Sequence, residues 1–209
     1  MDIYKIVVQI IVLIFAVIVH EVSHGYVAYK LGDPTAKQQG RLTLNPLPHI
    51  DPVWSILIPA FLIFTHAGFV IGGAKPVPIN PMYFKHQRRD IMLTGFAGPG
   101  SNLLLALISI LIMKLVRMIP GFYSDGLNIF LYYNIIINVG LAIFNLIPIP
   151  PLDGSKVLAF FLPARMELAY LRLERFGMII LIGLLATGML GYVFTPIFAG
   201  VMKLLNLLL

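Results

Sequence analysis

The first residues whose types and spacing suggest chemistry are His20–His24, which read His-Glu-Val-Ser-His. On a helix, His20 and His24 lie about one turn apart on the same face, so both imidazoles can bind one metal ion. Glu21 points about 100° further round the helix. This spacing predicts a zinc site with two histidine ligands and a carboxylate that can take a proton from water.

The setting of this motif is unusual, because it directly follows the uncharged and almost wholly apolar run Ile6–Val19. Ionisable side chains in such a setting are energetically costly and are usually functional. A buried histidine pair without a metal is the alternative interpretation. The glutamate between the two histidines favours the metal site.

Composition places the chain in a membrane. Of its 209 residues, 59% are hydrophobic and 11% are charged, whereas a soluble globular chain has about 25% charged residues. Residues 1–209 are expected to form a single domain with several spans and no large soluble part. The absence of cysteine excludes thiolate zinc sites and disulfides. The net charge of +6 is better explained by basic cytoplasmic loops than by a nucleic-acid partner.

Apolar segments separated by turn signals organise the chain. The first extends from Ile3 to about Leu31 and ends at Gly32–Pro34. No small-residue cleavage site precedes His20, so this segment is expected to remain as a transmembrane helix. The pattern predicts an all-α polytopic membrane protein of about 4–6 transmembrane or re-entrant helices. The later apolar segments are Val53–Gly73, Ile91–Ile119, Leu127–Ile147, Phe176–Phe194 and the short tail Pro196–Leu209.

One polar stretch near the motif has a different pattern. Gly40–Asn45 alternates between polar and apolar residues as a strand does, and Pro46 and Pro48 follow it. We expect a short β-hairpin beside the site. Its edge is expected to hold an extended peptide by strand addition.

A catalytic zinc ion usually has three protein ligands and one open position. Asp153 is the favoured third ligand, because it follows the proline-rich stretch Pro148–Pro151 directly after an apolar segment, and apolar sequence resumes at Val157. Irregular backbone at membrane depth is tolerated only where it is buried in protein or lines a cavity. Most other acidic residues lie in polar loops or beside basic residues, where solvation explains them.

These elements together resemble the site-2 protease family of intramembrane zinc metalloproteases. The resemblance rests on His20–His24, on Phe144–Pro148 followed by Leu152–Gly154, and on Gly98–Asn102. It covers most of the chain, and its two main motifs together are far more specific than His-Glu-x-x-His alone. Further stretches similar to smaller bacterial members are Gly32–Thr35, Gly40–Pro46 and Ala74–Pro78.

The resemblance implies that His20, His24 and Asp153 bind one zinc ion, that Glu21 is the catalytic base and that Asn145 holds the substrate backbone or the oxyanion. It implies regulated intramembrane proteolysis: hydrolysis of peptide bonds in or near transmembrane segments, with a transmembrane protein as substrate and the lipid bilayer as partner. The chain has no stretch that resembles a PDZ or CBS domain. The sequence does not indicate an oligomeric state.

A zinc-binding membrane transporter without proteolysis is the alternative function. Glu21 argues against it, because a transport site needs no base beside an open zinc position. Asn102 and Asn138 are best interpreted as buried asparagines that hydrogen-bond a neighbouring helix, and Gly98 as a residue that permits close helix packing.

The path of Val53–Gly73 decides the topology. If this segment crosses fully, the first and fourth apolar segments end on opposite sides; if it re-enters, His24 and Asp153 reach one depth. Pro59 and Gly72–Gly73 favour the re-entrant path. By the positive-inside rule the site then opens towards the cytoplasm in a multi-pass protein of the plasma membrane. The re-entrant path places most of the 15 basic residues on one side: Lys30, Lys37, Arg41, Lys75, Lys85, Arg88, Arg89, Lys156, Arg165, Arg172 and Arg175.

Overall fold

The computed structural model describes residues 2–65, 72–119 and 124–207. Helices are its only regular elements, and no strand occurs in these three ranges. The long helices are α1 (Ile3–Lys30), α4 (Gln87–Met118) and α5 (Asp125–Leu146). Each is long and apolar enough to cross a membrane. The described ranges are therefore all-helical, and their helices are those of a multi-pass membrane protein.

The fourth candidate span is broken. The expected segment Phe176–Phe194 is divided between α8 (Glu174–Ala186) and α9 (Met189–Asn206), which meet at 78°. Gly188 lies between them with a φ of 71°, a left-handed conformation that glycine adopts without steric cost. The described residues thus contain three candidate spans, or four if the bent pair is counted as one, and a shorter apolar helix at Pro52–Phe64. The expected number of four to six included re-entrant helices.

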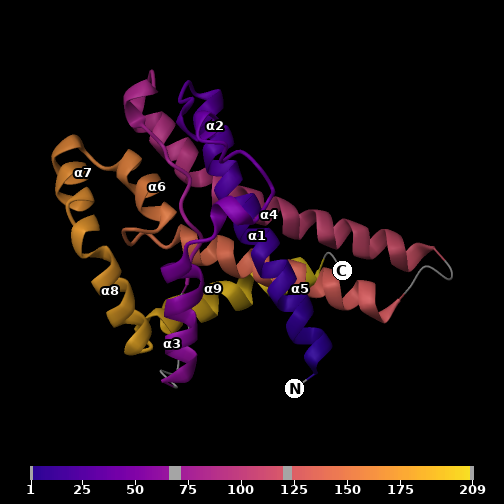
Figure 1. Ribbon diagram of the computed structural model, residues 1–209. Helices are drawn as coiled ribbons and strands as arrows, with labels where there is room; N and C mark the ends of the chain where they lie inside the picture. Colours follow the sequence, from indigo (N-terminus) through magenta and orange to yellow (C-terminus); the bar gives the residue numbers. More distant parts are fainter. Residues whose placement is uncertain (1, 66–71, 120–123, 208–209) are drawn as a thin grey trace.

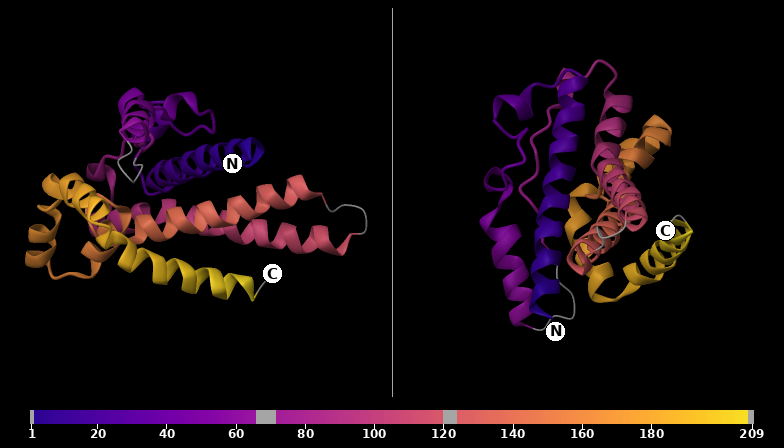
Figure 2. Two further views of the ribbon diagram at one scale, coloured as in Figure 1. Left: turned by 90° about the horizontal axis from the view of Figure 1, so that it is seen from below. Right: turned by 90° about the vertical axis from the view of Figure 1, so that its right-hand side faces the viewer.

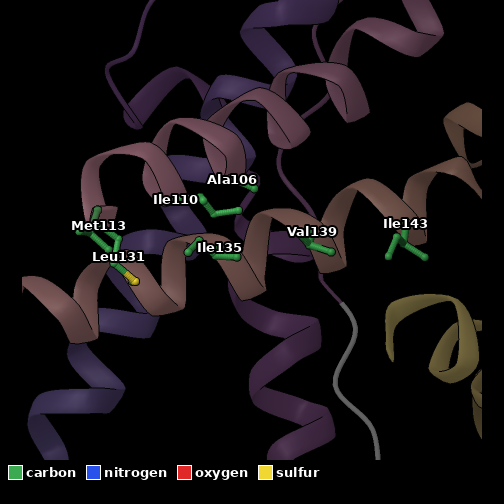
Figure 3. Packing of buried hydrophobic residues seen from close by; sticks show 7 residues of the cluster. All are labelled: Ala106, Ile110, Met113, Leu131, Ile135, Val139 and Ile143. Atoms are coloured by element: carbon green, nitrogen blue, oxygen red, sulfur yellow. The ribbon is translucent and has the colours of Figure 1, made fainter. Parts of the chain in front are cut away.

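Helices α4 and α5 lie side by side, and α1 crosses both of them (Figures 1 and 2). Apolar residues recur every three or four positions along the facing sides of α4 and α5, as helix packing requires. Helix α9 covers part of this core through Phe194 and Phe198. Figure 3 shows the buried cluster: Ala106, Ile110, Met113, Leu131, Ile135, Val139 and Ile143.

The described part of Val53–Gly73 is short. A π-helical turn (Pro52–Leu57) leads into α3 (Ile58–Phe64), and residues 66–71 lie outside the described part of the chain. The Gly73 amide nevertheless donates to the Trp54 carbonyl over 3.1 Å, and the Ser55 hydroxyl donates to the Gly73 carbonyl over 2.7 Å. The two ends therefore lie together, as a segment that enters and leaves on one side requires.

The predicted β-hairpin at Gly40–Asn45 is wrong. This stretch forms a turn and bends between α2 (Thr35–Gln38) and the 3₁₀ turn Leu47–His49. The physical reason is that side chains occupy backbone groups that would pair with a second strand. The His49 ring nitrogen Nε2, for example, hydrogen-bonds the Thr43 carbonyl over 2.9 Å. The segment Ala74–Asn80, which Arg41 contacts and which is in neither a helix nor a strand, contains Pro76 and Pro78, which have no N–H to donate to a ladder.

We call Ala74–Asn80 the strap, because hydrogen bonds near both of its ends tie it to the chain that follows α1. Its Lys75 amide donates to the His49 carbonyl over 2.8 Å, and its Asn80 amide donates to Asp33 Oδ2 over 2.6 Å. The Arg41 guanidinium donates to the Lys75 carbonyl over 2.7 Å. After the 3₁₀ turn Pro81–Tyr83 the chain enters α4.

Candidate metal centre

His20, His24 and Asp153 converge on one point although 133 positions separate the first from the last. The two histidine Nε2 atoms lie 3.0 Å apart, and Asp153 Oδ2 lies 3.1 Å from each of them. All three residues are buried. The first two belong to α1, and Asp153 begins the short helix α6 (Asp153–Phe161). The predicted third residue is therefore found beside the predicted pair.

Two glycines allow the surrounding helices to come this close. A Cβ atom on Gly98 of α4 would lie 2.6 Å from His20 Nε2, closer than real Cβ contacts, and would also strike His24 Nε2. A Cβ atom on Gly154 would strike the Leu146 carbonyl at the end of α5. Gly98 does permit close packing of α4 on α1, as expected, and it does so at the histidine pair itself.

A backbone carbonyl at His24 and a side-chain amide oxygen at His20 determine which nitrogen of each ring carries the proton. His24 Nδ1 lies 2.6 Å from the Thr94 carbonyl, which can only accept, so this nitrogen is the donor. His20 Nδ1 lies 2.6 Å from Asn102 Oδ1. The Asn102 amide orientation is fixed because its Nδ2 lies 3.2 Å from the Ala16 carbonyl. In their neutral forms both rings therefore present the Nε2 lone pair to the centre.

This arrangement fits a metal ion. Two nitrogen lone pairs and a carboxylate oxygen face one another, and they repel unless a cation lies between them. Two imidazoles and one carboxylate, with a fourth side left for water, form a ligand set typical of catalytic zinc. The residues present therefore fit one zinc ion.

The second oxygen of Asp153 has a different partner. Oδ1 accepts a hydrogen bond from Lys156 Nζ over 3.0 Å. Burial alone would raise the pKa of Asp153, whereas the positive charge of Lys156 beside Oδ1 lowers it and favours the ionised carboxylate. The carboxyl group therefore stays ionised and able to bind a cation.

Glu21 lies beside the three converging residues. Its Oε2 atom accepts a hydrogen bond from the Val77 amide of the strap over 2.9 Å. Asn145, near the end of α5, donates from Nδ2 to the Leu141 carbonyl of its own helix over 3.0 Å. Glu21 and Asn145 line the same cavity of about 200 Å³ as the three converging residues. The residues that line it are His20, Glu21, His24, Pro76, Val77, Ile79, Asn145, Pro151, Asp153 and Lys156.

Lys156 and Val77 also line this cavity, and the sequence had not assigned either of them to the site. Lys156 follows Asp153 by three positions on α6, a spacing that places both on one helix face and was visible in the sequence. Val77 contributes a backbone N–H, which no side-chain pattern signals. The interpretation of Asn102 and Asn138 as buried interhelical asparagines is confirmed, since Asn102 Nδ2 donates to Asn138 Oδ1 over 2.8 Å.

Sequence comparison identifies relatives of this chain. The profile of Peptidase family M50 matches residues 121–188. "Putative zinc metalloprotease YwhC" of Bacillus subtilis (strain 168) is 41% identical over 192 residues, which cover 90% of this chain and 84% of YwhC. The chain belongs to Peptidase family M50.

More distant M50 relatives are longer. "Putative zinc metalloprotease Rip2" of Mycolicibacterium smegmatis is 30% identical over 171 residues, which cover 80% of this chain and 62% of that protein. The protein of the same name from Mycobacterium tuberculosis (strain H37Rv) is 27% identical over 184 residues, with 86% and 67% covered. No solved structure matches the chain.

Membership of family M50 confirms the predicted resemblance to the site-2 proteases. It also confirms the predicted enzyme class, a zinc metalloprotease with a His-His-Asp metal site.

Proposed function

We propose that this protein is an intramembrane zinc metalloprotease that hydrolyses peptide bonds in or near the transmembrane segments of membrane proteins. The observation that carries this proposal is the convergence of His20, His24 and Asp153 beside Glu21 in a cavity, with both histidines on a candidate membrane span. In this proposal, residues 1–209 act as a single catalytic domain.

His20, His24 and Asp153 hold one zinc ion in this proposal. Zinc, when bound, polarises the scissile carbonyl and lowers the pKa of water to about 7. The two rings keep their Nδ1–H groups on Asn102 and Thr94, so their Nε2 atoms stay available and correctly oriented.

Glu21 acts as the general base. It takes a proton from the attacking water and passes it to the leaving amine. The Val77 amide holds Oε2, which fixes the carboxylate and leaves Oε1 to receive the proton. Fixing a base in its reactive position avoids the cost of orienting it during the reaction.

Asn145 supports the developing oxyanion. Its Nδ2 group has two N–H bonds, and the Leu141 carbonyl accepts one of them. The other can donate to the oxygen of the substrate, a type of interaction worth about 3 kcal/mol in a dry site.

The substrate in this proposal is a transmembrane protein that reaches the cavity from the bilayer, and its helix unwinds there to expose the peptide bond. We propose that the protein lies in the plasma membrane with the cavity open to the cytoplasm. The hydrogen bond that pairs Trp54 with Gly73, as a re-entrant path requires, and the basic residue Lys156 in the cavity lining support this orientation.

The decisive experiment compares the purified full chain with Glu21→Gln. Metal analysis and cleavage of a panel of single-span membrane proteins are measured on both. We expect one zinc per chain in both proteins and cleavage by the unsubstituted protein alone. Cleavage by Glu21→Gln at the full rate contradicts the proposal. Zinc transport across vesicles without any cleavage supports the transporter alternative.

A further inference from the structure

The two oxygens of the Asp153 carboxylate have different partners. Its Oδ2 atom lies 3.1 Å from the Nε2 atoms of both His20 and His24. Its Oδ1 atom lies 3.0 Å from Lys156 Nζ. One oxygen therefore faces the metal position, and the other is held by an ammonium group.

The packing of α4 against Lys156 leaves room for this contact. Gly95 of α4 lies against the aliphatic part of Lys156, and a Cβ atom on Gly95 would lie 2.9 Å from Lys156 Cβ and 3.2 Å from Lys156 Cδ. The missing side chain at Gly95 gives the lysine stem its place. The head group lines the metal cavity, and 37% of the side chain remains exposed.

A cation in this place has a cost. A lysine ammonium beside a zinc site repels the metal and weakens its binding, and a partly buried site screens this repulsion less than bulk water does. Ordering the long lysine side chain also costs entropy. If tight zinc binding were the only requirement of the site, a neutral residue at position 156 would serve better.

We infer that Lys156 is a positioning residue that limits Asp153 to one metal-binding oxygen and so keeps the fourth coordination position open. This inference rests on the proposed function. A carboxylate with both oxygens free can bind a metal through both. A zinc ion that also holds water would then already be five-coordinate, and the fourth position would no longer be open to the substrate. The hydrogen bond to Oδ1 prevents this.

The inference predicts effects of opposite sign in Lys156→Met, which keeps an unbranched side chain one atom shorter and removes the charge. Zinc should bind about tenfold more tightly, because the repulsion is gone and a second oxygen is free. The maximal cleavage rate should fall about tenfold, because the open position is lost. A lysine with a structural role alone would instead weaken both zinc binding and cleavage when replaced.

The test measures three quantities on the purified full chain: zinc affinity by competition with a chelator, the visible spectrum of the Co²⁺-loaded protein, and kcat with KM. Four-coordinate Co²⁺ absorbs more strongly than five-coordinate Co²⁺, so we expect weaker absorption in Lys156→Met. Lys156→Arg keeps a charged donor and should keep the original spectrum and zinc affinity. Lys85→Met, at an exposed lysine, is the control for loss of one charge.

Three outcomes overturn the inference: an unchanged Co²⁺ spectrum in Lys156→Met, weaker zinc binding in that variant, or an altered spectrum in Lys156→Arg. If Lys156→Met does not fold, the Lys156→Arg spectrum still decides. Failure of the proposed function appears elsewhere, as an unsubstituted protein without zinc or a Glu21→Gln variant that still cleaves.

Discussion

His20 Nδ1 lies 2.6 Å from Asn102 Oδ1, and this bond is the first in a chain of buried amides. Asn102 donates to Asn138 Oδ1, and Asn138 donates to both the backbone and side-chain oxygens of Asn134. The chain connects three helices: α1, α4 and α5. Each amide orients the next, so the position of a metal-binding ring on α1 depends on side chains of both neighbouring helices.

Replacing Asn102 should weaken zinc binding. Asn102→Leu removes the acceptor of His20 Nδ1–H and should lower zinc affinity about 10–100-fold, the usual effect of losing an outer hydrogen bond to a metal ligand. Chelator competition measures this affinity. Asn102→Asp keeps an acceptor at the same place and should bind zinc within a few-fold of the original protein. Equal affinities for all three proteins would show that Asn102 has no part in metal binding.

Gly98→Ala should prevent metal binding altogether. The added methyl group would occupy the space of His20 Nε2 and His24 Nε2, so α4 must move away or the rings must turn. Zinc content after purification measures the effect. Gly183→Ala on α8 is the matched control, because its methyl group would meet nothing within 4 Å. Full zinc occupancy in Gly98→Ala would contradict the described packing.

The backbone N–H of Val77 in the strap should hold the Glu21 carboxylate in its reactive position. Val77→Pro removes the N–H that holds Glu21 Oε2, and kcat should fall about tenfold while zinc content stays unchanged. Val77→Ala loses similar side-chain packing but keeps the N–H, and it should retain most of the activity. Rates measured on zinc-loaded proteins separate the two. If Val77→Ala is as slow as Val77→Pro, the packing of Val77 matters and its amide does not.

Zinc should stabilise the fold through Asp153. A ligand that binds only the folded state adds about 2.7 kcal/mol at 100 times its Kd. Thermal unfolding in detergent should therefore shift upwards when zinc is added after chelation. The shift should disappear in Asp153→Ala, which lacks the ligand from α6. An equal shift in this variant would place the zinc ion elsewhere.

The sequence was informative about the site where side chains carry the signal. His20 and His24 are neighbours by helical geometry alone, so their pairing needs no knowledge of the fold. Asp153 was found across 133 positions because a carboxylate next to apolar segments is costly without a partner. The same reasoning places buried asparagines between helices, as Asn102 and Asn138 are.

Elsewhere the sequence pattern indicated only the local structure, and contacts with distant residues determined the conformation that formed. The alternation in Gly40–Asn45 suggested a strand, but Arg41 is used to hold the strap and the Thr43 carbonyl is taken by His49. Apolar length suggested a continuous span from Phe176, yet Gly188 turns the chain between α8 and α9. The contact of Glu21 with the strap is made by a main-chain amide, and every residue except proline has one.

The hydrogen bonds that join Gly73 to Trp54 and Ser55 have a consequence for the evolution of this family. They hold the two ends of the intervening segment together. Insertions or substitutions within that segment can therefore occur without moving the strap or the motif on α1. The entropic cost of closing a loop grows slowly with its length. Because the two ends are held together, a longer loop would change the rest of the protein little. We expect size differences among relatives to gather between these two ends.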